Sequence, residues 1–312
     1  MKKQITNTIL MIRPASFRMN EETAVNNYFQ RKTEEIHLAT NHKAQAEFDA
    51  FVEVLKAKNI NVIVVEDDPK LDTPDALFPN NWISFHQDGR VALYPMFAKN
   101  RRRERREEVL LEVEKNGFKI ETIVDYTAAE DESLFLEGTG SLILDRENRK
   151  AYCATSARSE EDLIIEFCED FEYTPIIFEA RQSLNNERLP IYHTNVMMCV
   201  AEHFVIICLA SIDDKKQRKF VVNTLKKDGK QIIDITEAQM HQFAGNMLQV
   251  KSSVSDETYL VMSKTAHDSL AQNQIAEIEK HTEILSASIA TIEINGGGSA
   301  RCMLAEVFLP KE

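Results

Sequence analysis

The chain has 312 residues, of which 43% are hydrophobic and 28% are charged, and its formal net charge is -13. This composition is typical of a soluble globular protein with a substantial buried core. The negative charge argues against a nucleic-acid partner, because a phosphate backbone binds Lys and Arg, but it leaves a small anionic or zwitterionic substrate open.

The sequence predicts neither a membrane protein nor a metal or disulfide framework. The N-terminal apolar run from Ile9 to Ile12 is too short for a signal peptide, and no stretch approaches 18 apolar residues. The cysteines are odd in number, widely spaced and without a CxxC pair. We therefore expect a cytoplasmic protein without a structural metal. Its five cysteines are Cys153, Cys168, Cys199, Cys208 and Cys302.

Helical and strand patterns alternate along the chain, which is typical of an α/β protein. No Pro, Gly or Ser-rich linker interrupts them, so we expect one domain over residues 1–312. A strand is predicted at INVIVVE, residues 60–66. The predicted helices are 44–58, 103–116, 160–170, 215–229 and 268–281.

A repeat of about 55 residues is the clearest sign of organisation. Short apolar strands begin at polar or glycine-rich corners, and the corners are 57, 56, 52 and 56 residues apart. The strand ILMIRPASF near the N-terminus belongs to the same set. This spacing predicts one supersecondary unit used repeatedly, in a ring whose corners meet near a common axis. The alternative is ordinary α/β alternation with accidental spacing. The corners are Asn80, Glu137, His193, Gly245 and Arg301.

Cys302 is the candidate nucleophile. Three glycines, 296–298, precede it in a chain with only 9 glycines, and Arg301 stands beside it. Glycine lets another group approach the backbone closely, and a neighbouring cation favours the thiolate. The alternative is a buried cysteine that acts as a small hydrophobe, which is our interpretation of the other four.

His193 and Glu137 occupy matching corners of the repeat and are the candidate partners of Cys302. An imidazole base is a usual activator of a cysteine nucleophile. A carboxylate between apolar segments needs a partner if it is buried, and orienting the imidazole is a fitting role. The alternatives are a histidine that is satisfied by backbone groups and a turn glutamate that faces water.

Four segments resemble the guanidino-group modifying superfamily of arginine deiminases, dimethylarginine hydrolases and amidinotransferases. They are PDALFPNNW, LEGTG, YHTNV and GGGSARCM, within residues 74–303. The bacterial citrulline-utilisation hydrolases are the members that the chain resembles most. The resemblance implies a five-bladed pseudo-symmetric α/β propeller of ββαβ units, which agrees with the repeat.

The resemblance also implies roles for individual residues. Cys302 would be the nucleophile, His193 the general acid/base and Glu137 the supporting carboxylate. The planar end group of the substrate would lie between Asp75, Asn81 and Asn195. Arg158 would bind the substrate carboxylate, and Arg101 would be a second such arginine, although five arginines crowd its stretch. The alternative for most of that run is a solvated helix face.

Two departures from the family pattern bear on the substrate. Members that act on guanidinium usually have aspartates where this chain has Asn81 and Asn195. An aspartate only accepts hydrogen bonds, whereas asparagine also donates, which suits a ureido group with N–H donors and a carbonyl acceptor. We therefore expect hydrolysis of citrulline to ornithine, ammonia and carbon dioxide through a covalent Cys302 intermediate.

Other functions remain open from the sequence. The first alternatives are a deiminase or dimethylarginine-type hydrolase that acts on a guanidinium, and an amidinotransferase that passes the group to an amine. A binding protein without catalysis is a further alternative. The expected partner is a small amino-acid substrate, with no cofactor, metal, nucleic acid or membrane. The oligomeric state, including a homo-oligomer, is left open.

Overall fold

Small sheets with one shared pairing pattern form the framework of the computed structural model, which describes residues 3–31 and 37–311. In this described part of the chain, five sheets have three strands each. The central strand pairs antiparallel with one neighbour and parallel with the other. In the first sheet β1 (Thr8–Arg13) lies between β17 (Ala305–Glu306) and β2 (Asn61–Glu66). The chain therefore closes its first sheet with its last strand.

The other four sheets follow in chain order, with their central strand in the middle of each triplet. A separate hairpin joins β9 (Arg181–Leu184) to β10 (Glu187–Pro190). The triplets are β3 (Ile83–Phe85), β4 (Arg90–Leu93), β5 (Thr122–Asp125); β6 (Ile143–Asp145), β7 (Lys150–Ala154), β8 (Thr174–Phe178); β11 (Met198–Val200), β12 (Phe204–Ile207), β13 (Gln231–Asp234); and β14 (Leu248–Lys251), β15 (Thr258–Ser263), β16 (Glu283–Ala287).

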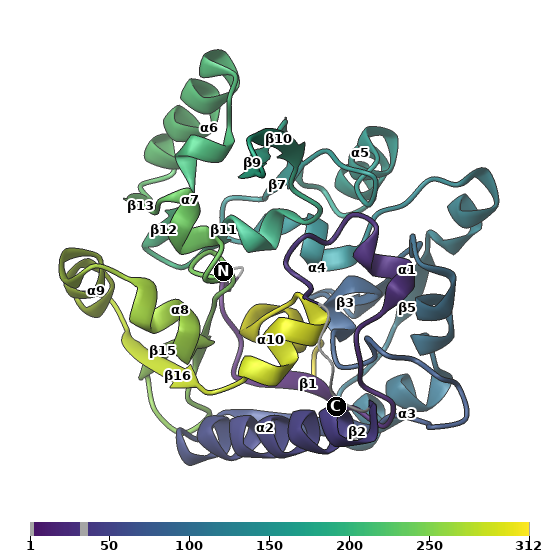
Figure 1. The fold of residues 1–312 in the computed structure, drawn as a ribbon. Helices are drawn as coiled ribbons and strands as arrows, with labels where there is room; N and C mark the ends of the chain where they lie inside the picture. The colour runs from purple at the N-terminus through teal and green to yellow at the C-terminus, as the bar shows by residue number, and fades with distance from the viewer. Residues whose placement is uncertain (1–2, 32–36, 312) are drawn as a thin grey trace.

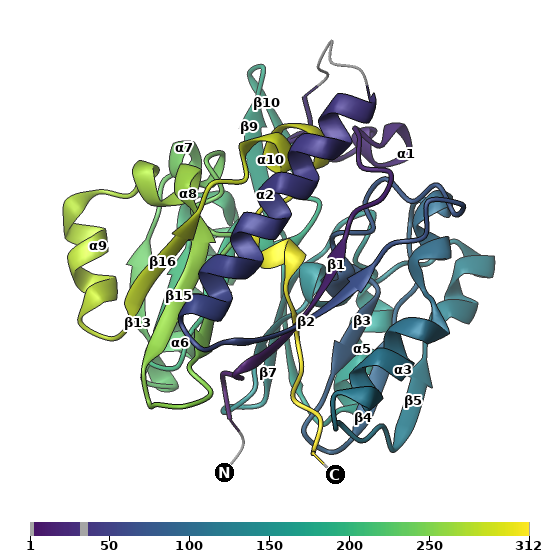
Figure 2. The same cartoon turned by 90° about the horizontal axis from the view of Figure 1, so that it is seen from below.

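Helices make the crossovers that parallel strand pairs require. They lie on the outside of the molecule, while α4 (Gly138–Ser141) and α10 (Ala290–Gly296) lie nearer its middle (Figure 1). Figure 2 shows α2 running across the molecule beside β1 and β2. The crossover helices are α2 (His37–Ala57), α3 (Glu107–Lys115), α5 (Glu161–Asp170), α6 (Lys215–Lys227), and the pair α8 (Lys264–Ser269) and α9 (Gln272–Glu279). The remaining short helices are α1 (Glu21–Ala24) and α7 (Glu237–Met240).

Four of the five predicted corners are short helical turns that precede the strands, and the fifth, at Gly245, is a non-helical turn. This corrects the expectation that corner residues open the strands themselves. These turns are tight because they pack on one another. Gly138 has φ +44°, and a Cβ there would lie 2.4 Å from the Asn80 carbonyl oxygen. The 3-10 turns at corners are η1 (Pro79–Asn81), η4 (Thr194–Val196) and η6 (Ala300–Met303); the others are η2 (Lys99–Glu104), η3 (Thr127–Glu132) and η5 (Leu209–Ser211).

Three helix predictions were wrong in their bounds. The predicted helix 44–58 begins earlier, at His37, and is α2. The predicted helix 103–116 begins only at Glu107, because Arg101 turns inward to Glu104 and forms η2 before an extended residue, Arg105. The predicted helix 268–281 is divided between α8 and α9 at Leu270, which is buried and extended. The helices predicted at 160–170 and 215–229 are confirmed as α5 and α6, with Glu160 and Asp214 as N-caps.

The mixed α/β class is confirmed, and it is built of many small sheets. The closed five-bladed ring and the single domain over residues 1–312 stay predictions. Within residues 3–31 and 37–311, no helix has the length and apolar character needed to cross a membrane.

Candidate active site

Glu137 and His193 form a buried pair at the point where α4 meets η4. His193 Nε2 lies 2.7 Å from Glu137 Oε2, and the two side chains are 2% and 0% exposed. The same carboxylate accepts hydrogen bonds from Arg158 Nη1 at 3.3 Å and from the Phe97 backbone N–H at 3.0 Å. Glu137 is the N-cap residue of α4, and His193 is the N-cap residue of η4.

Glu137 and His193 do not form a simple ion pair, because only the carboxylate is charged at pH 7. Burial alone would raise the pKa of Glu137, but Arg158 and His193 together hold that pKa well below its usual value. Burial lowers the pKa of His193 to about 4, against the opposing effect of Glu137. Arg158 thus balances most of the carboxylate charge, and the imidazole is neutral at pH 7.

The neutral imidazole has a defined tautomer. Glu137 is ionised and only accepts, so Nε2 carries the proton and Nδ1 keeps its lone pair. Nδ1 lies where Gly140 leaves space, since a Cβ there would be 2.9 Å from Nδ1 and 2.5 Å from Asn81 Nδ2. His193 therefore has an unprotonated Nδ1 that lies on the same side of the ring as Asn81.

Cys302 lies in η6, and two amide groups donate hydrogen bonds to its sulfur. Asn195 Nδ2 and Asn246 Nδ2 are each 3.3 Å from Sγ. The residue is 3% exposed. Gly298 packs behind it, since a Cβ there would lie 3.0 Å from the Phe78 ring and 3.3 Å from Cys302 Cβ. The glycine run thus lets the aromatic ring and the cysteine turn lie close together.

The adjacent Arg301 has a different role from the expected one. Its Nη1 donates to the Leu304 carbonyl at 2.7 Å, and its Nη2 donates to Glu306 Oε2 at 2.8 Å. The guanidinium is therefore committed to a carboxylate on β17. The expectation that Arg301 is the cation that favours the thiolate is corrected.

Asn81 and Arg101 form one hydrogen-bonded group beside the pair. Arg101 Nη1 donates to Asn81 Oδ1 at 2.7 Å, while its Nε and Nη2 bind the Glu104 carboxylate at 2.9 Å each. Nη2 also donates to the Phe78 carbonyl at 3.1 Å. The buried guanidinium is thus fully occupied by the protein, and it holds the Asn81 amide in place.

Asp75 lies next to Arg101, with Nε and Oδ2 4.0 Å apart. Its Oδ2 accepts from Asn20 Nδ2 at 2.7 Å and from Thr23 Oγ1 at 3.2 Å, whereas its buried Oδ1 has no hydrogen-bond partner among the described residues. Burial raises the pKa of Asp75 against the effects of Arg101 and Asn20. The site therefore contains one carboxylate oxygen that is still available to a donor.

The segment 20–31 covers these groups. Arg158 Nε donates to Asn26 Oδ1 at 2.9 Å and Nη2 donates to the Thr23 carbonyl at 2.9 Å. Asn27 Nδ2 donates to the Gly296 carbonyl at 3.3 Å, and the Arg31 N–H donates to the Ile294 carbonyl at 2.8 Å. The segment thus closes over the arginine that was predicted to bind the substrate carboxylate.

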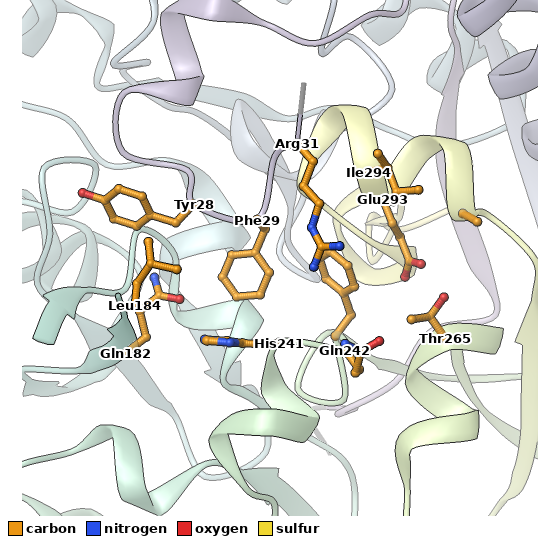
Figure 3. A pocket seen from close by; sticks show the side chains of 12 residues that line it. Tyr28, Phe29, Arg31, Gln182, Leu184, His241, Gln242, Thr265, Glu293 and Ile294 are labelled. Atoms are coloured by element: carbon orange, nitrogen blue, oxygen red, sulfur yellow. The ribbon is translucent and has the colours of Figure 1, made fainter. Parts of the chain in front are cut away.

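A cavity of about 350 Å³ lies on the far side of this segment. Figure 3 shows Arg31 and Glu293 on one side of the cavity, and Phe29 above the ring of His241. Phe29 also contacts Tyr192, with ring centroids 5.9 Å apart, and Tyr192 precedes His193. Cys302, His193 and Glu137 are not among the residues that line the cavity. Phe29 is linked to the site through Tyr192, whose ring lies 4.6 Å from that of His193 between centroids.

The structure thus brings the predicted residues into one neighbourhood. Sequence reasoning missed Asn246 and the residues of segment 20–31. Asn246 had a usable signal: it is the second residue of its corner, the position that Asn81 and Cys302 hold in theirs. Segment 20–31 had none, because its contacts are with residues remote in sequence.

The other cysteines differ from Cys302 in their surroundings. All five are free thiols in buried positions. Burial raises the pKa of Cys153, Cys168 and Cys199 to about 12 each, which keeps them as unreactive thiols. Across the described residues, no group of three or more His, Cys, Asp or Glu side chains could hold a metal ion.

The chain is similar to known proteins in both sequence and fold. The family model described as N,N dimethylarginine dimethylhydrolase, eukaryotic, matches residues 13–309. The chain belongs to this family. Its place in the guanidino-group modifying superfamily is therefore confirmed. No curated protein sequence matches the chain.

Several solved structures have the same fold as this chain, although their sequence identity to it is low. ArgZ, an arginine dihydrolase from the ornithine-ammonia cycle in Cyanobacteria, is 17% identical with a TM-score of 0.73, over 98% of this chain and 41% of that one. A mutant of AgrE with L-arginine is 19% identical with a TM-score of 0.74, over 98% and 40%. The chain thus spans about two fifths of ArgZ and AgrE.

A dimethylarginine dimethylaminohydrolase adduct with S-methyl-L-thiocitrulline is 13% identical with a TM-score of 0.61, over 97% of this chain and 99% of that one. Taken together, these likenesses establish the fold that carries the site.

Proposed function

We propose that the protein is a cysteine hydrolase that acts on the ureido or guanidino end group of a small amino acid, with Cys302 as nucleophile. One observation carries this proposal. The turn 193–195 supplies both the imidazole that binds Glu137 and the amide that binds the Cys302 sulfur. This turn thus links a nucleophile, an acid/base group and an orienting carboxylate, which are the parts that covalent catalysis needs.

The roles of these groups follow from their protonation. His193 Nδ1 takes the thiol proton as Sγ attacks the end-group carbon, and it then gives that proton to the departing amine. The S–C bond forms and a C–N bond breaks, which leaves an acyl group on Cys302. A water molecule, deprotonated by the same Nδ1, releases this group. From citrulline the released group is a carbamic acid, whose remaining C–N bond breaks as it decomposes to carbon dioxide and an amine. Glu137 stabilises the imidazolium during each transfer and does not itself take the proton.

Citrulline is the substrate that we favour, with ornithine, ammonia and carbon dioxide as products. The groups nearest the sulfur are neutral amides from Asn195 and Asn246, and Asn81 stands beside Nδ1. Amides complement a neutral group that both donates and accepts, and they add no negative charge that would attract a cation.

A guanidino amino acid is the second candidate, and Asp75 is the observation that favours it. Its buried Oδ1 has no partner among the described residues and would accept an N–H of a guanidinium. The relatives named above include an arginine dihydrolase and a structure with L-arginine, which agrees with this candidate.

Substrate entry requires movement, because Cys302 is 3% exposed. We propose that segment 20–31 opens, so that Asp75 and Arg158 exchange its polar groups for those of the substrate. The five three-stranded sheets would form the blades of a pseudo-symmetric propeller around this site.

The test is an assay for ammonia released from citrulline or arginine and for dimethylamine released from dimethylarginine. We expect turnover of citrulline by the wild type and none by Cys302→Ala. Cys199→Ala, which changes a buried thiol in β11, is the matched control and should retain activity. Arginine turnover with citrulline left intact would favour the second candidate, and activity in Cys302→Ala would contradict the proposal.

A further inference from the structure

Two side-chain amides converge on the Cys302 sulfur, and neither carries a charge. We propose that Asn246, together with Asn195, stabilises Cys302 as the thiolate, so that the enzyme does not need a positively charged substrate to activate its nucleophile. This inference rests on the proposed role of Cys302 in hydrolysis. It assigns Asn246 a catalytic role, since its amide contacts the reacting atom.

The orientation of the Asn246 amide is fixed by its other contacts. Oδ1 accepts a hydrogen bond from the Arg301 backbone N–H at 3.0 Å. Nδ2 donates to the Asn195 carbonyl at 3.0 Å and to Cys302 Sγ at 3.3 Å. A reversed amide would place an acceptor against that carbonyl and a donor against an N–H. The group that faces the sulfur is therefore a donor, and it cannot rotate away because Asn246 is fully buried.

The Asn195 amide contacts the same sulfur and keeps one free atom. Its Nδ2 donates to Sγ, while its buried Oδ1 has no hydrogen-bond partner among the described residues. A buried acceptor without a partner is costly, so this oxygen is suited to an N–H of the substrate. One amide thus contacts the nucleophile and is available to the end group that it attacks.

Two cationic candidates near η6 do not stabilise the Cys302 thiolate, so this role falls to the two amides. His193 is neutral, and Arg301 is bound by Glu306. η1 and β15 pack against η6, and η1 carries no titratable group. The titratable residues on the facing segments are Tyr192 and His193 before η4, Glu293 on α10, Tyr259 on β15 and Arg301 on η6 itself.

This arrangement has a consequence for substrate choice. A guanidinium carries a positive charge that can itself favour a thiolate beside it, whereas a ureido group carries none. Hydrogen bonds to the charged form favour that form without any net charge. The two neutral amides therefore stabilise the thiolate, which an uncharged ureido substrate cannot do. When free Cys302 ionises, its proton goes to the solvent and His193 stays neutral. In a turnover that begins from the thiol, the neutral Nδ1 accepts the proton, so the step is balanced without another reactant.

The thiolate fraction of Cys302 is measured directly by its rate of alkylation with iodoacetamide across pH, read at Cys302 by peptide mass spectrometry. The variants are Asn246→Ala, Asn195→Ala and Asn246→Asp, of which the last keeps the acceptor for Arg301 and loses the donor to sulfur. We expect the midpoint of the pH profile to rise by about one pH unit in each alanine variant, a tenfold loss of thiolate below it, and further in Asn246→Asp.

Ser211→Ala is the matched control, because Ser211 Oγ contacts another buried sulfur, that of Cys208, at the same 3.3 Å. Its Cys302 profile should equal that of the wild type. Thermal unfolding verifies that each variant is folded. An unchanged midpoint in both Asn246→Asp and Asn195→Ala would overturn the inference. A shifted midpoint in an enzyme that does not hydrolyse citrulline would leave it standing and reject the favoured substrate instead.

Discussion

At the residue scale, the buried carboxylate of Glu137 organises the site through its two partners, Arg158 and His193. Burial lowers the pKa of His193 and keeps it a neutral, hydrogen-bonded base, while Arg158 balances the charge of the Glu137 carboxylate. The pairing of His193 with Glu137, and the contact of the turn 193–195 with Cys302, could be predicted as one neighbourhood because these residues lie at recurrent corners of a repeat. The role of Arg158 as their support could not be predicted, since a sequence does not tell whether an arginine faces a ligand or a buried glutamate.

The lowered pKa of His193 predicts how stability depends on pH. The unfolded chain binds a proton at this residue below its ordinary value of 6.5, whereas the folded protein binds it only near 4. The contribution of His193 to the free energy of unfolding is therefore fully present above pH 6.5. It is lost as the pH drops toward 4, by on the order of 3 kcal/mol.

We expect the free energy of unfolding, measured by urea titration between pH 7 and 4, to fall less steeply in His193→Gln. The control is His267→Gln, which changes a partly exposed histidine beside Asp268 and should keep the wild-type slope. Equal slopes in the wild type and His193→Gln would show that the imidazole is already charged in the fold.

At the element scale, short turns aim the side chains and the strands anchor the turns. η1, α4, η4 and η6 each precede a short buried strand, and α4 packs against both η1 and η4. The strands and the corner positions could be predicted from spacing and apolar runs. The turns could not, because each is stabilised by contact with another turn far along the chain.

Gly140 tests this packing. An alanine Cβ would lie 2.5 Å from Asn81 Nδ2 and 2.9 Å from His193 Nδ1, so one of them must shift. We expect Gly140→Ala to lose about two orders of magnitude in kcat and roughly 1–3 kcal/mol in stability.

The comparison is Gly117→Ala, at the end of α3, where a Cβ would meet nothing within 4 Å and φ is +80°. It should cost about 1 kcal/mol from backbone strain and leave kcat unchanged. Wild-type kcat in Gly140→Ala would show that the turn can yield without disturbing the imidazole.

At the scale of the whole molecule, remote segments close the site. Segment 20–31 joins Arg158 on one side to the glycine run on the other, and β17 returns to pair with β1. Residues that meet from such separations leave no local pattern, which is why the repeat indicated the neighbourhood but not the closing segment. In the opening that we propose for substrate entry, this structure is the closed state.

Asn26→Ala tests the closing contact, since Asn26 Oδ1 accepts from both Nε and Nη2 of Arg158. Loss of about 1 kcal/mol from the closed state should speed alkylation of Cys302 roughly fivefold, with no change in the midpoint of its pH profile. Asn116→Ala, which removes an exposed cap of α3, is the control and should alkylate at the wild-type rate. A slower rate or a moved midpoint in Asn26→Ala would place Asn26 in the chemistry and not in the closure.

The central claim is that the sulfur of Cys302 carries the substrate's end-group carbon during turnover. The direct measurement is an acid-quenched single turnover with citrulline labelled at the ureido carbon, followed by peptide mass spectrometry. We predict that the label is found on the peptide containing Cys302 and is absent from Cys302→Ala. Label on another cysteine, or ammonia release without any labelled peptide under the same quench, would contradict the account.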